Sequence, residues 1–286
     1  MLSSLYAAAR SDYLQDRGFD MNEFIADELE GIRKLIEFNK IKEAFFANQV
    51  VSEPHESVKE HINTLNRDGI VVVPGFLSAE QCEWICMNLP DRSTFTPSPE
   101  GDRSMFYLNA ARDPVFSAFF DDPRNARIMK GYIGENAVPL RQSMEVRTAK
   151  GPVHAFNRVF HMDSWKPRVK AFLYLHDVTE NDGPVAYLKG SHKGDWRLPM
   201  ECKISSLYQT GETGYAKDLD VVWVGCYWPY EVNGIKEKHG LEEVLCTGKV
   251  GTLVVFDSRG LHRATELTND HRYILIDHYI AEGHST

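Results

Sequence analysis

The sequence predicts a mainly β protein, a sandwich or barrel with helices packed against its outside. From Val138 onward, short apolar segments of strand length are separated by Gly, Pro, Asn and Asp, and few of them repeat at helical spacing. Before this point, apolar residues recur at helical spacing instead. Together these patterns predict a β domain of α+β type with an N-terminal helical buttress.

Residues 21 to 48 carry the first helical pattern. Their apolar side chains lie on one helical stripe with charges between them, at Phe24, Ile25, Leu29, Ile32, Leu35, Ile36, Ile41 and Phe45. This spacing predicts one or two amphipathic helices. A second helical stretch follows around Val58, Ile62 and Leu65.

A short strand and a capped helix come next. The run GIVVVPG, from Gly69 to Gly75, is typical of a buried strand. Ser78 and Gln81 form a capping-box pattern, which predicts a helix that continues through Cys82 and Cys86. One buried helical face explains these two cysteines better than metal binding does.

The clearest later strands are predicted at Val169 to His176, Val221 to Tyr227, Val250 to Asp257 and Tyr273 to Ile280. Polar, loop-like runs around Thr210 to Lys217 and Asn233 to Gly240 predict inserted substrate loops at about residues 200–249. Because no repeat or flexible linker interrupts the pattern, we expect residues 1–286 to form a single domain. It would comprise a helical N-terminal extension, 1–66, and a β core, 67–286.

Composition excludes several classes of function. The net charge of −9 argues against a general nucleic-acid binder, because phosphate contacts need a basic surface. The 5 cysteines form no CxxC pair, which favours a reducing, cytoplasmic location over a disulfide framework. No apolar run approaches the roughly 18 residues of a membrane span, so we expect no membrane association.

His161, Asp163 and His262 form a candidate metal site. In an extended segment, residues i and i+2 point the same way, so His161 and Asp163 present an imidazole and a carboxylate to one point. A third ligand must come from another strand, and His262 follows the strand GTLVVF and a tight turn. Two imidazoles and one carboxylate are the facial triad of non-haem Fe(II), with positions open for a co-substrate and O₂.

Arg272 opens the last aliphatic strand, RYILIDHYI, and shares a face with Ile274 and Ile276. A partly buried guanidinium there needs an anion. A 2-keto dicarboxylate can fill the open positions on iron and also supply the anion for Arg272. Its keto acid chelates iron while its far carboxylate pairs with the arginine. We therefore expect 2-oxoglutarate as co-substrate.

These motifs resemble the phytanoyl-CoA dioxygenase family of Fe(II)- and 2-oxoglutarate-dependent oxygenases. The resemblance covers about Ile70 to Ile280 and is most specific in FHMD, LYLHDVTENDGPVAYLKGSHK, GTLVVFDSRGLHR and Arg272. It implies a double-stranded β-helix, a cupin-like jelly-roll barrel, with iron held by His161, Asp163 and His262. Met162 departs from the hydroxyl or amide that is common there, and the carboxylate of Asp163 argues against halogenation.

Helper residues for the co-substrate are predicted on one strand face. Lys170, Phe172, Tyr174 and His176 alternate with an aliphatic face that we expect to meet the outer helices. Lys170 and Tyr174 are therefore candidates to contact 2-oxoglutarate or substrate, although a solvated strand face explains Lys170 equally well. His192, in the sequence GSH, is interpreted as holding a turn, and Asp257 as bracing the loop before His262.

The substrate is expected to be a small anionic organic molecule. Basic residues outnumber acidic ones from Glu145 to Lys170. This excess is explained equally well by attraction of an anionic substrate and by an ordinary solvent-exposed charged rim. The expected reaction is hydroxylation of a C–H bond with release of succinate and CO₂. One alternative is a cupin-like metalloenzyme, such as an isomerase, that uses the same three ligands; another is a non-catalytic binding module.

Overall fold

One long helix, α2 (Met21–Ala47), forms the described part of the first of two units into which the chain divides, Met1–Gln49 and Val50–Thr286. The computed structural model describes residues 21–47, 53–98, 104–148, 159–210 and 225–281. The predicted amphipathic stripe therefore forms one continuous helix. No helix in the described ranges is long and apolar enough to cross a membrane.

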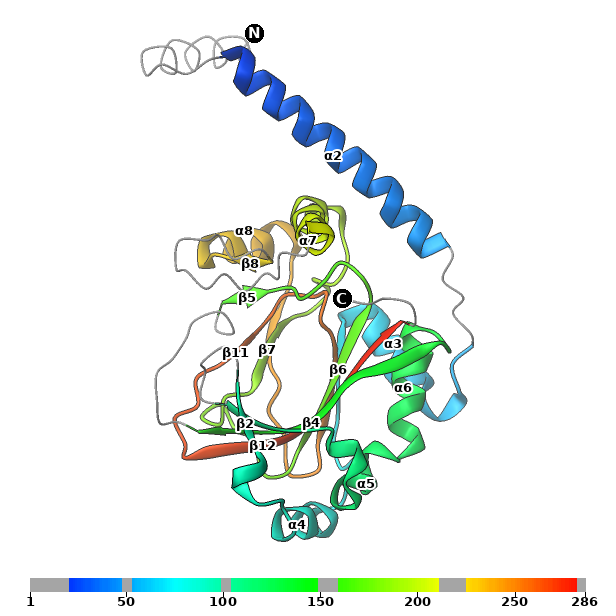
Figure 1. The fold of residues 1–286 in the computed structure, drawn as a ribbon, viewed down its shortest axis with the longest axis vertical. Helices are drawn as coiled ribbons and strands as arrows, with labels where there is room; N and C mark the ends of the chain where they lie inside the picture. Colours follow the sequence, from blue (N-terminus) through cyan, green and yellow to red (C-terminus); the bar gives the residue numbers. More distant parts are fainter. Residues whose placement is uncertain (1–20, 48–52, 99–103, 149–158, 211–224, 282–286) are drawn as a thin grey trace. The chain divides into compact units, whose positions relative to one another are not determined.

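Two antiparallel sheets form the second unit (Figure 1). Within the described residues, the larger sheet has seven strands, in the order β1 (Ile70–Val73), β10 (Leu253–Asp257), β6 (Arg168–Tyr174), β12 (His271–Ala281), β4 (Ala137–Thr148), β3 (Ser104–Leu108) and β2 (Thr96–Pro97). The smaller sheet has five in the same part of the chain, β8 (Cys226–Tyr227), β5 (Phe160–His161), β11 (His262–Ala264), β7 (Val185–Leu188) and β9 (Glu243–Leu245). This confirms the predicted β architecture with flanking helices.

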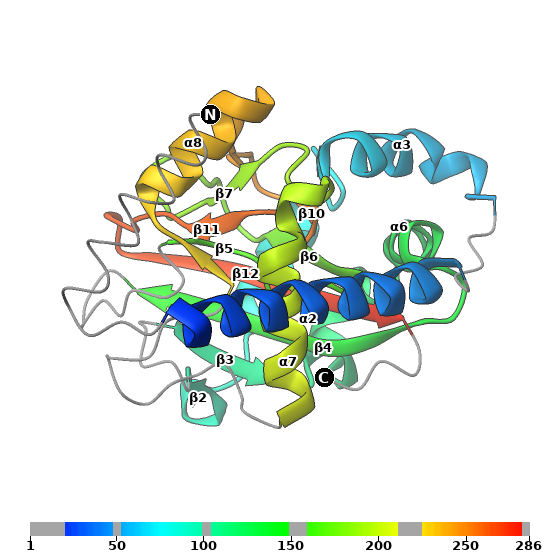
Figure 2. The ribbon, with the colours of Figure 1, turned by 90° about the horizontal axis from the view of Figure 1, so that it is seen from above.

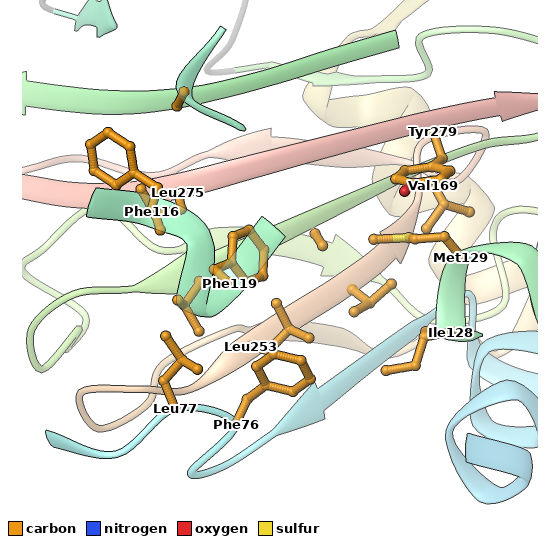
Figure 3. Close-up of a cluster of buried hydrophobic side chains, with 14 of the residues drawn as sticks. Phe76, Leu77, Phe116, Phe119, Ile128, Met129, Val169, Leu253, Leu275 and Tyr279 are labelled. Carbon is orange, nitrogen blue, oxygen red and sulfur yellow. The ribbon is translucent and has the colours of Figure 1, made fainter. Parts of the chain in front are cut away.

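Helices cover the outer face of the larger sheet. They are η1 (Glu56–Val58), α3 (Lys59–Asp68), α4 (Ala79–Met87), η2 (Arg92–Thr94), η3 (Ala110–Arg112), η4 (Pro114–Phe116), α5 (Ser117–Phe120) and α6 (Pro123–Ile133). Their buried side chains meet the sheet in one apolar cluster, in which Phe119 and Met129 pack near Leu253 and Val169 (Figure 3). Burying such a side chain contributes about 1.5–3 kcal/mol each.

The two faces of β6 separate an outer core from an inner one. Val169, Ala171 and Leu173 belong to the outer cluster, as their aliphatic pattern predicted. Tyr174 faces the other way, into a cluster that joins β1, β6, β10 and β12 to the side chains of β7 in the smaller sheet. The space between the sheets is therefore lined by a mixture of aromatic, aliphatic and polar residues.

The predicted capping box opens α4. The Gln81 amide donates to the Ser78 hydroxyl at 3.2 Å, and the Ser78 amide donates to the Gln81 side chain at 2.9 Å. Both groups would otherwise lack a partner in the first helical turn. Cys82 is fully buried on the resulting helical face, which confirms its interpretation as a core residue.

The segment between β7 and β10 contains η6 (Asp195–Arg197) and two helices, α7 (Leu198–Thr210) and α8 (Pro229–His239). The predicted loop at Asn233 to Gly240 is therefore wrong. Pro229 is favourable at the first helical position, Glu231 accepts a bond from the Trp228 amide at 2.7 Å, and Gly240 ends the helix in the left-handed region. Helix α8 lies beside the smaller sheet in both views (Figures 1 and 2). Most of the predicted loop Thr210 to Lys217 and of the predicted strand Val221 to Tyr227 lies outside the described residues.

Candidate active site

Two neighbouring strands of the smaller sheet place the two histidines side by side. His161 at the end of β5 is the direct cross-strand partner of His262 at the start of β11. The backbone after β5 is held on both sides, because the Met162 amide donates to the Gly225 carbonyl and the Asp163 amide donates to the Ser258 carbonyl, each at 2.9 Å. The sheet thus brings residues about a hundred positions apart to one point.

Backbone carbonyls orient both imidazole rings. Nδ1 of His161 lies 2.9 Å from the Val159 carbonyl, and Nδ1 of His262 lies 2.9 Å from the Gly260 carbonyl. Each Nδ1 therefore carries the proton, so the lone pair of each neutral imidazole is on Nε2. Both Nε2 atoms lie 3.6 Å from Oδ1 of Asp163, and the three ligand atoms lie within 4.8 Å of one another.

Burial sets the protonation of this cluster. Desolvation lowers the pKa of His161, and desolvation together with the neighbouring His161 lowers the pKa of His262 to about 3. For Asp163, burial raises the pKa, but Lys170 and the two histidines outweigh it and hold that pKa well below its usual value. At neutral pH the site offers two neutral imidazoles and one carboxylate, the donor set that a divalent transition metal requires.

Lys170 contacts the candidate metal carboxylate. Its Nζ lies 2.6 Å from Oδ2 of Asp163, on the side away from the atom that faces the two imidazoles. On the larger sheet, Lys170 pairs with Phe256 of β10 and His278 of β12. The predicted contact of Lys170 with co-substrate or substrate stays a prediction; the ion pair with Asp163 was not anticipated from the sequence.

Arg272 is buried, as predicted, with 3% of its surface exposed. Its Nη2 lies 3.0 Å from Oε2 of Glu145, and its Nη1 donates to the Gly183 carbonyl. Among the described residues, its Nε has no hydrogen-bond partner. The anion that the sequence required for Arg272 is therefore present within the protein, at a position that no motif marked.

Tyr174 lies on the same inner face and is fully buried. Its hydroxyl donates to the Cys246 carbonyl at 2.5 Å. Burial raises its pKa, Cys246 raises it further, and Arg272 opposes the shift. Tyr174 therefore shares surroundings with Arg272, while its predicted contact with the co-substrate stays a prediction.

The turn before His262 is braced by a buried polar network. Asp257 accepts bonds from the Tyr132 hydroxyl at 2.7 Å and from the Arg259 side chain at 2.5 Å, and its backbone carbonyl accepts from Tyr187 at 2.9 Å. A side chain on Gly260 would collide with the Tyr187 hydroxyl. This confirms Asp257 as a brace, but Tyr132 and Tyr187 carried no recognisable signal because they come from distant elements.

His192, the histidine in the sequence GSH, is held by a backbone contact. Nε2 of His192 lies 3.3 Å from the backbone carbonyl of Asn66, in the last turn of α3. The ring is not among the three residues whose ligand atoms converge in the described part of the chain. This agrees with its interpretation as a residue that holds a turn.

Comparisons with known proteins agree with this geometry. The family model described as phytanoyl-CoA dioxygenase (PhyH) matches residues 65–273. No curated protein sequence matches the chain. The chain is similar in structure to HygX from Streptomyces hygroscopicus with nickel and 2-oxoglutarate bound, at a TM-score of 0.53 and 19% identity over 79% of this chain and 88% of that one.

Two further solved structures are similar. EctD from S. alaskensis has a TM-score of 0.52 and 19% identity, with 82% of each chain covered. The epimerase SnoN, in complex with Fe³⁺, alpha ketoglutarate and nogalamycin RO, has a TM-score of 0.51 and 18% identity, covering 78% of this chain and 83% of that one. At these identities the likeness shows the jelly-roll fold.

Proposed function

This chain belongs to the phytanoyl-CoA dioxygenase family, and from that premise we propose that it is an iron(II)- and 2-oxoglutarate-dependent oxygenase that hydroxylates a small anionic substrate. The observation that carries the proposal is the convergence of His161, Asp163 and His262, with both Nε2 atoms aimed at the same carboxylate oxygen. Two nitrogens and one oxygen on one side of an ion leave its other side for exogenous ligands.

The donor set fits iron(II) in charge as well as in geometry. The two Nδ1–H groups are bound to carbonyls, so neither ring can turn its Nε2 away without losing a hydrogen bond. When bound, iron(II) with 2-oxoglutarate and O₂ supplies the oxidising chemistry, and the co-substrate leaves as succinate and CO₂. The protein's part is to hold the ligands and to exclude water from a site whose histidines are about 95% buried.

Arg272 supports 2-oxoglutarate as the co-substrate. Its guanidinium is buried on the inner face of β12 and keeps an N–H group, at Nε, without a partner among the described residues. A buried donor of this kind favours a ligand that can accept from it. HygX, which shares the fold, was crystallised with nickel and 2-oxoglutarate.

Two cations beside the site support an anionic substrate. Lys166 and Arg168 follow Asp163 within five positions and are only partly buried. Burial and the neighbouring Arg168 both lower the pKa of Lys166, as expected where like charges gather. By contrast, Arg147 is buried and Lys170 pairs with Asp163. We propose that Lys166 and Arg168 attract the anionic group of the substrate.

The test is anaerobic addition of iron(II) and then 2-oxoglutarate to the protein. A chelated keto acid gives a weak visible charge-transfer band, which we expect with the wild-type protein and not with His161→Ala. Absence of the band in the wild-type protein would overturn the proposal. Substrate-coupled succinate release across a panel of anionic metabolites would then identify the substrate class.

A second candidate is an isomerisation without a co-substrate at the same three ligands, because sites of this type accept several divalent ions. Arg272→Ala distinguishes a co-substrate-free isomerase from an oxygenase. Loss of 2-oxoglutarate binding together with loss of activity supports the oxygenase. Unchanged activity without 2-oxoglutarate supports the isomerase.

A further inference from the structure

Arg272 and Glu145 form a buried ion pair inside the candidate site. Nη2 of the arginine lies 3.0 Å from Oε2 of the glutamate, and the two residues are only 3% and 7% exposed. They come from the adjacent strands β12 and β4, where Glu145 is the partner of Ile274, two positions beyond Arg272. Because water is largely excluded, this pair is screened much less than a surface pair.

The glutamate is itself held in place. The Ser104 hydroxyl donates to Oε1 of Glu145 at 2.5 Å, and Ser104 is 1% exposed. Each carboxylate oxygen therefore has a protein partner, one a hydroxyl and the other the guanidinium. A charged acceptor with a hydrogen bond at both oxygens is a stable counter-ion.

The arginine is not saturated by these contacts. A guanidinium has five N–H groups, and in the described part of the chain Arg272 gives bonds to Glu145 and to the Gly183 carbonyl, while Nε has no partner. Arg147 lies directly across from Arg272 on β4 and is also buried. Glu145, Arg147 and Arg272 thus lie on the same face of the sheet.

We propose that Glu145 competes with the co-substrate for Arg272 and thereby makes binding at this site depend on metal chelation. This inference rests on the proposed function. A second carboxylate brought to Arg272 is attracted by the guanidinium and repelled by Glu145, and both effects are strong where the effective dielectric constant is low. Arg272 alone therefore holds an incoming acid weakly.

The competition weakens the binding of co-substrate and product alike, with different consequences for the two. 2-Oxoglutarate has a keto acid that chelates the metal in addition to the carboxylate that reaches Arg272. Succinate retains the far carboxylate but has lost the keto group. Glu145 opposes both acids at Arg272, and only the keto acid has the chelate to offset this. Glu145 thus lowers the affinity of the site for both acids and favours release of succinate, which has no chelate to hold it.

The experiment measures binding of 2-oxoglutarate and of succinate to nickel-loaded protein by isothermal titration calorimetry. Glu145→Gln keeps the size of the side chain and one acceptor oxygen but removes its charge. We expect this variant to bind both acids more tightly, by about tenfold, which corresponds to about 1.4 kcal/mol. Inhibition of turnover by succinate should strengthen by a similar factor.

Glu60→Gln, on the exposed surface of α3, is the matched control and should change neither affinity. Because Glu145→Gln leaves a buried arginine without its counter-ion, it could fail to fold. Ser104→Ala is therefore measured as well, because it removes a hydrogen bond that holds Glu145 without removing its charge. It should increase the affinity for both acids by a smaller factor, about threefold, or about 0.65 kcal/mol.

The outcomes separate the two proposals. If nickel-loaded wild-type protein binds no 2-oxoglutarate, the proposed function fails. If the wild-type protein binds it, and Glu145→Gln binds both acids equally well or more weakly, the competition is overturned and Glu145 only positions Arg272. If Glu145→Gln does not fold, unchanged or weaker binding in Ser104→Ala overturns the inference.

Discussion

Single side chains set the charge balance of the candidate active site. Oδ1 of Asp163 faces the two imidazoles, and Oδ2 of the same carboxylate faces Lys170. Arg272 faces Glu145 in the same manner. Asp163 and Arg272 therefore each have a partner of opposite charge on a neighbouring strand or segment. Ligand affinity depends on these partners as well as on the ligating residues.

Lys170→Met should lower the stability of the metal-free protein. Nζ lies 2.6 Å from Asp163, and the two side chains are only 22% and 15% exposed, so the change leaves a largely buried carboxylate without its cation. A bound divalent ion replaces that cation. We expect the unfolding temperature to fall without metal, and nickel to raise it more in the variant than in the wild-type protein.

Lys249→Met is a matched control for Lys170→Met. It also breaks a lysine–aspartate pair, with Asp177 at 2.8 Å, but its side chain is 86% exposed. Surface pairs contribute about 0–1 kcal/mol, so little change is expected in either condition. An equal loss of stability in Lys170→Met with and without nickel would show that Lys170 acts only in the fold.

Strands and turns decide where the ligands meet. The turn between β10 and β11 carries the carbonyl of Gly260 that orients His262, and the Asp257–Arg259 pair closes this turn. β5 and β11 then bring His161 and His262 opposite each other. The position of one imidazole therefore depends on the turn that precedes it.

Asp257→Asn should weaken both the fold and the metal site. Asp257 is fully buried and pairs with Arg259 at 2.5 Å, so removal of the charge costs about 3 kcal/mol of the free energy of unfolding. Because the turn orients His262, nickel affinity should fall by about tenfold. Urea unfolding and calorimetric nickel titration measure the two effects.

Asp91→Asn is the control for that substitution. Asp91 is exposed and accepts a bond from the Ser93 amide at the start of η2, a position where Asn and Asp are equivalent. Stability and nickel affinity should both stay unchanged. If Asp257→Asn lowers stability while nickel affinity stays at the wild-type value, the turn does not position His262.

The molecule as a whole should be stabilised by metal. An ion that binds the folded state alone adds about 2.7 kcal/mol to the free energy of unfolding at a hundred times its dissociation constant. We expect a chelator to lower the unfolding temperature of metal-loaded wild-type protein. His161→Ala should show no response to chelator, and a response of wild-type size in that variant would place the metal elsewhere.

Stability should also depend on pH through Asp277. This residue lies on the outer face of β12 and is fully buried against α6, where Asn125 donates to it at 2.6 Å. Burial raises its pKa to about 7, and the Asn125 and Gln142 side chains oppose the shift. Between the ordinary aspartate pKa of about 3.9 and pH 7, the folded protein binds one more proton than the unfolded chain.

The free energy of unfolding should therefore fall as pH rises through this interval, by up to about 4 kcal/mol. Asp277→Asn removes that proton and its pH dependence, so the stability of the wild-type protein relative to the variant should decrease from pH 5 to about pH 7 and level off by pH 8. Urea unfolding at unit pH steps measures it. Asp270→Asn changes an exposed residue, so its free energy of unfolding should vary with pH as that of the wild-type protein does. The same pH dependence in Asp277→Asn as in the wild-type protein would refute the argument.

Local chemistry made much of this protein predictable. The capping box at Ser78, the alternation on β6 and the spacing of His161 and Asp163 each depend on neighbours within a few positions, because caps and strand faces are local geometry. The stretch Asn233 to Gly240 was predicted as loop because it is a polar run, and a capped start at Pro229 made most of it helical instead.

The charge partners of the site required the folded chain. Glu145 meets Arg272 across 127 positions, and Tyr132 meets Asp257 across 125. A lone glutamate or tyrosine has no local pattern that names its partner, since the pairing arises only when sheet register places two strands together. The residue types and their spacing thus determined that the chain carries a candidate metal site and a buried arginine suited to an acid. The pairing of β4 with β12 decided that Glu145 lies beside Arg272, and the pairing of β5 with β11 decided that His161 lies opposite His262.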